Sequence, residues 1–375
     1  NFDEITKNKI YESIDKAKLD RKKDLLDDYN LLKFRIGRIP LMTDFLEFES
    51  RDPFQYIEYS NSMYEFSLNE EDKVIFKKLR TDEKKLLGYL SKNINNGKRA
   101  IESFLLKLII ENGNTDINNL KKEYKKLFPT IKLEDDSINS ALNSLNLLFH
   151  TEKHKKSLLP IGEINDYEIL TKKGKNIRTG KTLKKALENE TFKTYLLDSV
   201  MYSLSIFSSK LERSDFVDGF IRYEKYSRGD VFRILNWKKK PVEQNVGGYM
   251  VSSDSKNCAI FVTYNKKEGI SETTKYEDKF LNEAVFTYKT KSQRTIDSRE
   301  VKLISAQKEN NIRLPLFLKK SDDEGIEHYY IGELYVIEES IKQEFMQPNK
   351  KAPVVTFSFQ LDKPVEENLY KYVVK

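Results

Sequence analysis

The chain has 375 residues and a mass of 44.2 kDa, with 38% hydrophobic and 33% charged residues. This length predicts two or three domains, and 22 Phe and 21 Tyr supply enough apolar surface to exclude wholesale disorder. The sequence has no apolar run of about 18 residues and a single cysteine, Cys258, so we expect a cytoplasmic protein with no membrane span and no internal disulfide. One cysteine and three histidines cannot build a Cys/His zinc site, and we predict no metal site.

The net charge of +7 comes from the middle of the chain. Residues 1–150 carry 26 basic and 26 acidic side chains, residues 151–300 carry 29 and 21, and residues 301–375 carry 11 and 12. Basic residues interleaved with Tyr and Trp are typical of a surface that binds the phosphate backbone of a nucleic acid. A solvated lysine-rich surface gives the same pattern, so charge alone leaves both readings open.

Residues 1–210 carry apolar side chains mostly at helical spacing, and we expect a helical domain there. An extended segment at 166–173 and a basic loop precede the last helix. Helices followed by a strand and a basic loop predict a winged-helix-like unit, in which a helix or the wing meets DNA. Small helical domains that bind only protein share this pattern. The predicted helices are 2–29, 41–48, 69–79, 81–94, 99–111, 116–127, 135–150 and 181–210.

Residues 211–375 read as short alternating runs separated by turn residues, which predict a β-rich, barrel-like domain. Two helices interrupt the strands, at 227–236, where Ser227 and Asp230 give a helix-start signal, and at 298–308. The predicted fold class is therefore α+β, with a helical domain at 1–210 followed by a β-rich domain at 211–375. The predicted strands are 217–223, 248–251, 259–264, 284–288, 313–319, 328–336, 354–361 and 369–374.

A metal-dependent nuclease is one alternative. Asp278 together with Glu300 and Lys302 supplies the acid and the Glu-x-Lys that a restriction-type nuclease places on two strands. Glu-x-Lys arises by chance in so charged a chain, and residues 298–308 read as a helix. No Ser-His-Asp or Cys-His set is present, and we expect this segment to have no catalytic residues.

The motifs of residues 223–320 carry a resemblance to a known family. They are Tyr226-Ser227-Arg228-Gly229-Asp230-Val231, Leu235-Asn236-Trp237, residues 260–266, residues 276–280, Ser292-Gln293-Arg294 and residues 316–325. From roughly residue 160 to 375 this succession resembles the domain of unknown function DUF3427. The whole chain is similar to the C-terminal part of SauUSI-like type IV restriction endonucleases.

The resemblance implies a coupler at 1–210 and a DNA target-recognition domain at 211–375. The parent protein would also hold a phospholipase-D-type nuclease and a superfamily 2 helicase motor that use ATP and Mg²⁺. No nuclease or motor motif occurs in these residues, so we expect no cofactor here. The implied partners are the helicase and nuclease domains of the parent and duplex DNA carrying 5-methylcytosine or 5-hydroxymethylcytosine, without a membrane.

Reading a methylated cytosine requires an apolar or aromatic contact at C5 and a polar group on the base edge, and a flipped base needs a stacking ring. Asp278 or Asp254 could accept from the cytosine edge. Phe261 and Trp237 also fit a hydrophobic core. The candidates that could bind the modified base are Tyr264, Tyr276, Asp278, Tyr249 and Trp237, and those for the DNA phosphates are Arg228, Lys266, Lys275, Lys291 and Arg294.

The second hypothesis is a regulatory module that binds the helicase motor and touches DNA only through nonspecific phosphate contacts. The neutral charge of residues 1–150 favours protein contacts for that half.

Overall fold

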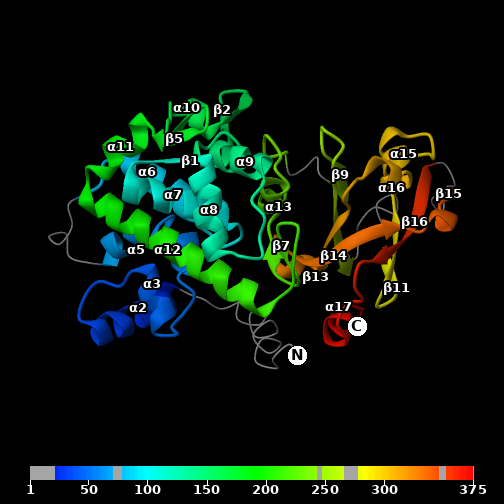
Figure 1. The fold of residues 1–375 in the computed structure, drawn as a ribbon. Coiled ribbons are helices and arrows are strands. Elements are labelled where there is room, and N and C mark those ends of the chain that lie inside the picture. Colours follow the sequence, from blue (N-terminus) through cyan, green and yellow to red (C-terminus); the bar gives the residue numbers. More distant parts are fainter. Residues whose placement is uncertain (1–21, 71–77, 243–246, 266–277, 346–351, 375) are drawn as a thin grey trace. The chain divides into compact units, whose positions relative to one another are not determined.

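The chain folds into two compact units, each described here by itself (Figure 1). Unit 1 comprises Asn1–Arg213 and Asn236–Lys240, and unit 2 comprises Ser214–Leu235 and Pro241–Lys375. The computed structural model describes residues 22–70, 78–242, 247–265, 278–345 and 352–374. No helix in these ranges combines the length and the apolar character needed to cross a bilayer.

Unit 1 is helical, as the sequence predicts, and is built around two apolar helices. The long helix α12 packs against α7, α3 and α6, and α7 buries Ile101, Phe104 and Leu105 among other side chains (Figure 1). The predicted helix 181–210 breaks at Asn189, whose buried side chain hydrogen-bonds Glu83 at 3.1 Å. The helices are α2 Lys22–Ile36, α3 Met42–Glu47, α4 Phe54–Ser60, α5 Met63–Glu70, α6 Thr81–Tyr89, the π-helical turn η1 Leu90–Ile94, α7 Ala100–Asn112, α8 Ile117–Leu127, α9 Asp135–Leu145, α10 Ile161–Ile164, α11 Lys181–Leu187 and α12 Glu190–Arg213.

A winged-helix topology lies within unit 1. The strands β1 (Asn114–Asp116), β4 (Leu170–Lys173) and β5 (Asn176–Thr179) form an antiparallel sheet in the order β1-β5-β4. The chain order is α7, β1, α8, α9, β4, β5, which is helix, strand, helix, helix and a two-stranded wing. A hairpin of β2 (Thr151–His154) and β3 (Ser157–Pro160), followed by α10, is inserted before β4. The winged-helix-like prediction is confirmed.

Residues 236–240 return from unit 2 to unit 1 and lie against α9; we call them the clip segment. The amide of Asn143 donates to the carbonyl of Lys238 at 2.8 Å, and the backbone N–H of Lys240 donates to Phe149 at 2.8 Å. The amide oxygen of Asn236 accepts from the buried Arg99 at 3.3 Å. These bonds fix the clip segment to the winged-helix part of unit 1.

Unit 2 is a bent, mostly antiparallel sheet in the order β11-β12-β16-β14-β13-β10-β9. Among the strands that the structure describes, only β10 and β13 run parallel, and β8 and β15 pair at the sides of the sheet. The elements are β6 Phe216–Val217, β7 Phe220–Ile221, β8 Lys225–Tyr226, α13 Arg228–Ile234, β9 Tyr249–Val251, β10 Cys258–Asn265, β11 Lys279–Asn282, β12 Val285–Lys289, α15 Arg299–Ser305, α16 Gln307–Asn310, β13 Pro315–Ser321, the 3₁₀ turn η2 Asp322–Glu324, β14 His328–Val336, the 3₁₀ turn η3 Glu338–Ser340, β15 Lys342–Phe345, β16 Pro353–Leu361 and α17 Glu367–Val374.

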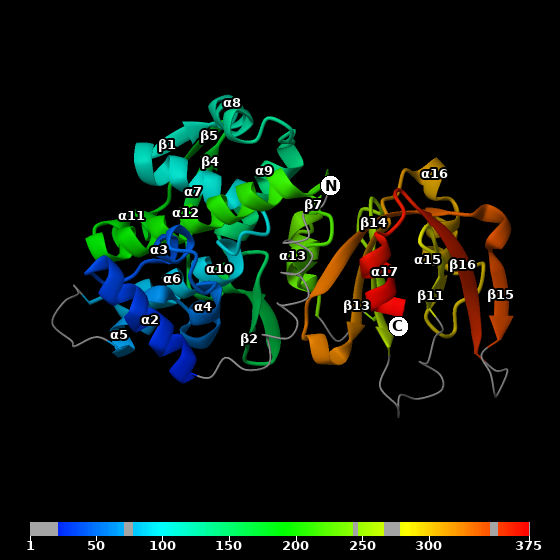
Figure 2. The same cartoon turned by 90° about the horizontal axis from the view of Figure 1, so that it is seen from below.

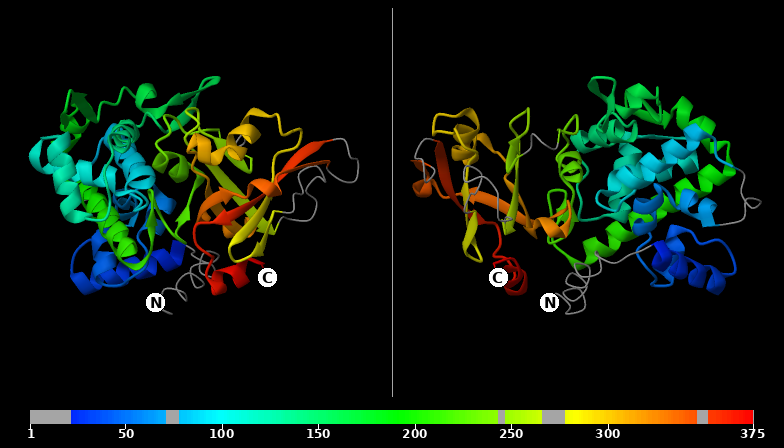
Figure 3. Two further views of the ribbon diagram at one scale, coloured as in Figure 1. Left: turned by 45° about the vertical axis from the view of Figure 1, so that its right-hand side comes forward. Right: turned by 180° about the vertical axis from the view of Figure 1, so that it is seen from behind.

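The sheet bends but does not close into a barrel within the described residues. Strand β14 pairs with β13 along its first part and with β16 along Leu334–Val336, so one strand belongs to both halves of the bend (Figure 3). The short strand β9 and the strand β11 form the two edges. The β-rich unit is therefore as predicted, whereas the closure that a barrel needs is not seen.

The predicted strand 369–374 is a helix, α17, which packs against β13 (Figure 2). Leu369 and Val373 are buried on one face, four residues apart. Glu367 and Lys371, with the same spacing, form an ion pair along the helix. The helical period, rather than alternation, therefore explains this segment.

An aromatic cluster fills one face of the sheet. Phe261 stacks on Phe317 with ring centroids 5.4 Å apart, and Phe220 contacts Phe317 and Tyr330 at 5.1 Å. Phe261 is thus a core residue, as the sequence analysis allowed.

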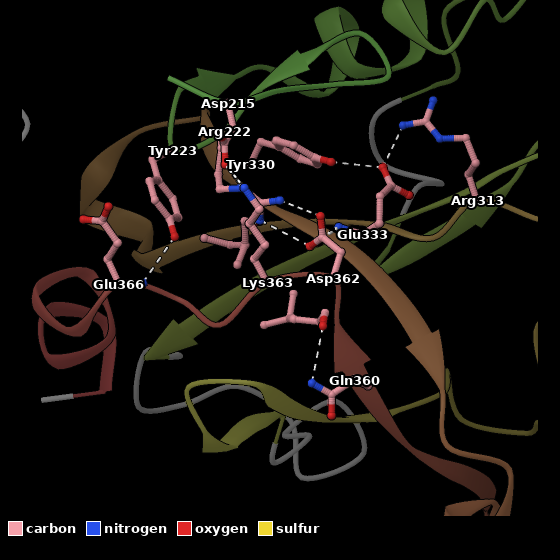
Figure 4. A network of polar contacts seen from close by, with 12 residues as sticks. Asp215, Arg222, Tyr223, Arg313, Tyr330, Glu333, Gln360, Asp362, Lys363 and Glu366 are labelled. Atoms are coloured by element: carbon pink, nitrogen blue, oxygen red, sulfur yellow. Dashed lines mark hydrogen bonds and ion pairs between the residues drawn. The ribbon is translucent and has the colours of Figure 1, made fainter. Parts of the chain in front are cut away.

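A buried polar network holds the bend of the sheet (Figure 4). Arg222 donates to both carboxylate oxygens of Asp362, at 3.2 and 2.5 Å, and to the carbonyl of Ile331 at 2.5 Å. Glu333 accepts from Arg313 at 2.7 Å, and its own N–H donates to Asp362. Position 332 requires a glycine, because a Cβ there would lie 2.3 Å from Asp362 Oδ1.

Candidate nucleic-acid interface

Tyr249 on β9 is the centre of a cluster of aromatic and charged side chains at one edge of the sheet. Its buried ring meets the ring of Tyr288 edge-on, with centroids 6.1 Å apart. The ammonium of Lys291 lies 4.8 Å from the Tyr249 ring centroid, a cation–π geometry. The Tyr249 ring therefore contacts both the ammonium of Lys291 and the ring of Tyr288.

Two consecutive glycines allow this close packing. A Cβ on Gly248 would lie 2.3 Å from the hydroxyl of Tyr288, and one on Gly247 would lie 2.9 Å from Cε of Lys291. Gly247 also has a φ of +57°, which side chains other than glycine rarely adopt. The Gly-Gly pair is thus required by the cluster.

The cluster carries more positive than negative charge. Arg294 forms an ion pair with Glu300 on α15, and Lys291 lies near both. Burial and the neighbouring charge of Arg294 lower the pKa of Lys291. Burial opposes ionisation of Glu300, yet hydrogen bonds and Arg294 lower its pKa, so the carboxylate is charged. Two cations against one anion favour an anionic ligand.

Tyr264 lies on β10, the neighbour of β9, and Asp278 lies beside β11, the strand at the other end of the sheet order. The half-buried ring of Tyr264 stacks on Phe280 of β11 with centroids 6.2 Å apart, and burial raises its pKa. Asp278 directly precedes β11 and accepts a hydrogen bond from the N–H of Lys289 at 3.1 Å. Since Lys289 follows Tyr288 on β12, the Asp278 carboxylate and the Tyr249–Lys291 pair lie on either side of one strand end.

Arg228, at the start of α13, adds a third cation beside the Gly-Gly pair. Its guanidinium lies 5.2 Å from the Phe261 ring centroid and donates to the carbonyl of Gly247 at 3.4 Å. Buried His328 also meets the Phe261 ring edge-on, with ring centroids 5.5 Å apart. Burial, together with Lys319 and Arg228, lowers the pKa of His328 to about 3, so it is neutral at physiological pH.

The structure brings six of the predicted site residues onto or beside β9–β12 and α13 of unit 2. Trp237 lies in the clip segment of unit 1 and is half-buried. Asp254 shapes the turn between β9 and β10, where it accepts from Ser252 at 2.6 Å. Tyr276, Lys266 and Lys275 lie outside the described residues. The residues brought together are Tyr249, Tyr264, Asp278, Arg228, Lys291 and Arg294.

Tyr288 and Phe280 complete the cluster, and neither was among the predicted site residues. Phe286 and Tyr288 alternate along β12, and both are buried, so the sequence contained the signal for Tyr288. β11 has no clear alternation, which hid Phe280. Glu300 lies on α15 and not on a strand, so it lacks the strand placement that the Glu-x-Lys of a restriction-type nuclease requires. The described residues contain no group of three or more His, Cys, Asp or Glu able to hold a metal ion.

In comparisons with known proteins, two family models match two different parts of the chain. Residues 220–373 match the family described as domain of unknown function (DUF3427). The predicted resemblance to DUF3427 is confirmed, but it begins near residue 220 and not near 160. Residues 25–210 match another family, domain of unknown function (DUF8090).

No curated protein matches the chain. Among solved structures, one match is described as "Sulfur binding domain and SRA domain of ScoMcrA complexed with phosphorothioated DNA". It is 9% identical, has a TM-score of 0.27 and covers 76% of this chain and 90% of its own. A TM-score this low carries no argument about this chain.

Proposed function

We propose that unit 2 binds duplex DNA and reads 5-methylcytosine or 5-hydroxymethylcytosine, with the base flipped out of the helix. The observation that carries the proposal is that four predicted site residues flank β12. Asp278 accepts from the N–H of Lys289 and Tyr264 stacks on Phe280 of the neighbouring strand β11, while Lys291 and Arg294 directly follow β12. An aromatic ring, a carboxylate and excess positive charge are the three groups that a flipped cytosine and its phosphates require.

In this proposal Tyr264 and Asp278 bind the base. Tyr264 is half-buried and backed by Phe280, so its ring is fixed for stacking. The carboxylate of Asp278 accepts from Lys289, and a carboxylate has about four acceptor positions, so it has the capacity to accept from cytosine N4 as well. Phe280 offers an apolar contact for a methyl group.

Lys291, Arg294 and Arg228 would hold the flanking phosphates. Arg294 is held by Glu300, and the ring of Tyr249 supports Lys291. Side chains that are already fixed lose less conformational entropy on binding than free lysines. Their charge contributes to binding without selecting a base.

The proposal includes a coupling to an ATP-dependent helicase and nuclease in a longer SauUSI-like type IV restriction endonuclease. The DUF3427 match and the motifs of residues 223–320 support it. The equal numbers of basic and acidic side chains in residues 1–150 support protein contacts for that part of unit 1, the coupler.

The test is fluorescence anisotropy with the full chain and three duplexes that differ only in carrying cytosine, 5-methylcytosine or 5-hydroxymethylcytosine, at two salt concentrations. We expect tighter binding of a modified duplex at both salts. Asp278→Ala, which removes the acceptor, should bring the modified duplex to the affinity of the plain one, a loss of roughly tenfold, since a good base contact is worth about 1–3 kcal/mol. Lys291→Met should weaken all three duplexes equally.

Equal binding of the three duplexes that fades together with salt would refute base reading. It would instead favour the regulatory module with nonspecific phosphate contacts. Equal loss of affinity for modified and plain DNA in Asp278→Ala would refute the role of Asp278.

A further inference from the structure

The basic wing of the winged-helix unit and the clip segment meet on α9. We propose that they form a second DNA-binding surface, which holds duplex phosphates regardless of sequence while α9 stays out of the grooves. We call it the wing–clip surface. It consists of six exposed cations, Lys172, Lys173, Lys175, Arg178, Lys238 and Lys239.

Two asparagines one turn apart on α9 bring the wing and the clip segment together. The ammonium of Lys172 donates to Oδ1 of Asn139 at 2.7 Å, and Nδ2 of Asn143 donates to the carbonyl of Lys238 at 2.8 Å. Residues four apart on a helix are neighbours on one face. The lysines of the wing therefore lie beside those of the clip segment.

The charge of this surface is not cancelled by its surroundings. Lys173, Lys238 and Lys239 form no ion pair with any described residue. Of the acids beside the wing, Asp116 caps α8 by accepting from the N–H groups of Asn118 and Asn119, and Asp135 is paired with Lys121 at 2.6 Å. The pKa of Asp135 is lowered by Lys121 first, and then by Lys172 and Lys175, which places these wing lysines close to it.

The same contacts occupy the face of α9 that a winged-helix protein places in the major groove. Ser137 and Asn143 bind the clip segment, Asn139 binds the wing, and Ile138 and Leu142 are buried. Because Ser137, Asn139 and Asn143 of α9 are engaged in these contacts, we expect the surface to contact phosphates without selecting a sequence.

The test uses the full chain and two plain-cytosine duplexes of unrelated sequence, titrated at several salt concentrations. The variant is Lys172→Ala, Lys173→Ala, Lys175→Ala. The control, Lys85→Ala, Lys184→Ala, Lys185→Ala, removes the same charge from exposed positions of α6 and α11. Lys238→Glu, Lys239→Glu is a second variant that keeps the backbone bond to Asn143. Circular dichroism checks that each variant folds.

We expect the wing variant to bind both duplexes at least roughly tenfold more weakly at about 0.1 M salt, and its plot of log affinity against log salt to be shallower by about 2–3, since each lost phosphate contact removes about 0.9. The control should change affinity less than twofold. The charge-reversed clip variant should weaken binding at least as much as the wing variant.

Equal affinities of wing and control variants would overturn the proposal. So would a preference of the wild-type chain for one plain sequence that the wing variant abolishes, or tighter binding of duplex RNA than of DNA. The outcome is separable from base reading, because wing variants should leave the ratio of modified to plain affinity unchanged. If the wild-type chain binds modified and plain duplexes equally while the wing variant still binds both more weakly, base reading is refuted and the wing–clip surface is not.

Discussion

Arg222 and Asp362 hold the bend of the sheet, and removing Arg222 should destabilise unit 2 strongly. The Arg222 side chain is 4% exposed and that of Asp362 is 18% exposed. In Arg222→Met, the carboxylate of Asp362 loses its bidentate partner and the carbonyl of Ile331 loses its donor. Breaking a buried pair costs about 3–5 kcal/mol. Because Asp362 is partly exposed and still accepts from the N–H of Glu333, we expect about 3 kcal/mol.

The double variant Arg222→Met, Asp362→Asn separates the ion pair from the loss of packing. Asn keeps an acceptor for the Glu333 N–H but carries no charge, so no uncompensated carboxylate remains. The double variant should therefore cost at least about 1 kcal/mol less than the sum of the single variants.

The assay is hydrogen exchange of backbone amides in β14 and β16, read against a unit 1 helix as the internal control. Two compact units need not unfold as one, and the single tryptophan, Trp237, lies in unit 1, so its fluorescence reports the wrong unit. Additive costs in the double variant, or a cost below about 1 kcal/mol for Arg222→Met, would refute the reasoning.

Two further predictions concern the stability of unit 2 around Gly248 and His328. Gly248→Ala should cost about 1–3 kcal/mol, because its Cβ would lie 2.3 Å from the hydroxyl of Tyr288, and Tyr288→Phe in the same chain should restore most of the loss in thermal unfolding. No rescue would contradict the steric cause. His328 has a folded pKa of about 3, below its unfolded value of about 6.5, so it stabilises the fold above pH 6.5 and this contribution is lost as pH falls towards 3. Hydrogen exchange at decreasing pH should show a shallower loss for His328→Leu, and an unchanged slope would exclude His328 as its source.

Strands with a clear pattern could be predicted from the sequence, whereas their arrangement could not. The segment His328–Val336 is found with the predicted bounds, because its apolar run lies between turn residues. Whether the sheet closes depends on the length and pairing of β9 and β11 at its edges, and no local pattern records this. The strand prediction for residues 369–374 was wrong. A segment of six residues is too short for its apolar side chains to distinguish the helical period from the alternation of a strand.

The candidate site was predictable by residue type but not by position. Tyr249, Asp278, Lys291 and Arg294 were chosen as aromatic, acidic and basic residues near strand ends, and the end of β12 brings them together. Trp237 closely follows helix α13 of unit 2 in the sequence. Nevertheless Asn236–Lys240, the segment that contains Trp237, packs in unit 1. A return of this kind depends on long-range bonds such as Asn143 to Lys238, which have no local signature.

The clip segment also restricts how the two halves of this protein can be exchanged in evolution. By sequence it lies within the DUF3427 match at 220–373, yet it packs in the unit that matches DUF8090 at 25–210. A recombination event near residue 215 would therefore bring a foreign clip to a resident α9. Two of its anchors, the carbonyl of Lys238 and the N–H of Lys240, are backbone groups that almost any sequence supplies. Compatibility then depends largely on Asn236, whose side chain meets Arg99 and whose φ of +62° asparagine tolerates better than most residues.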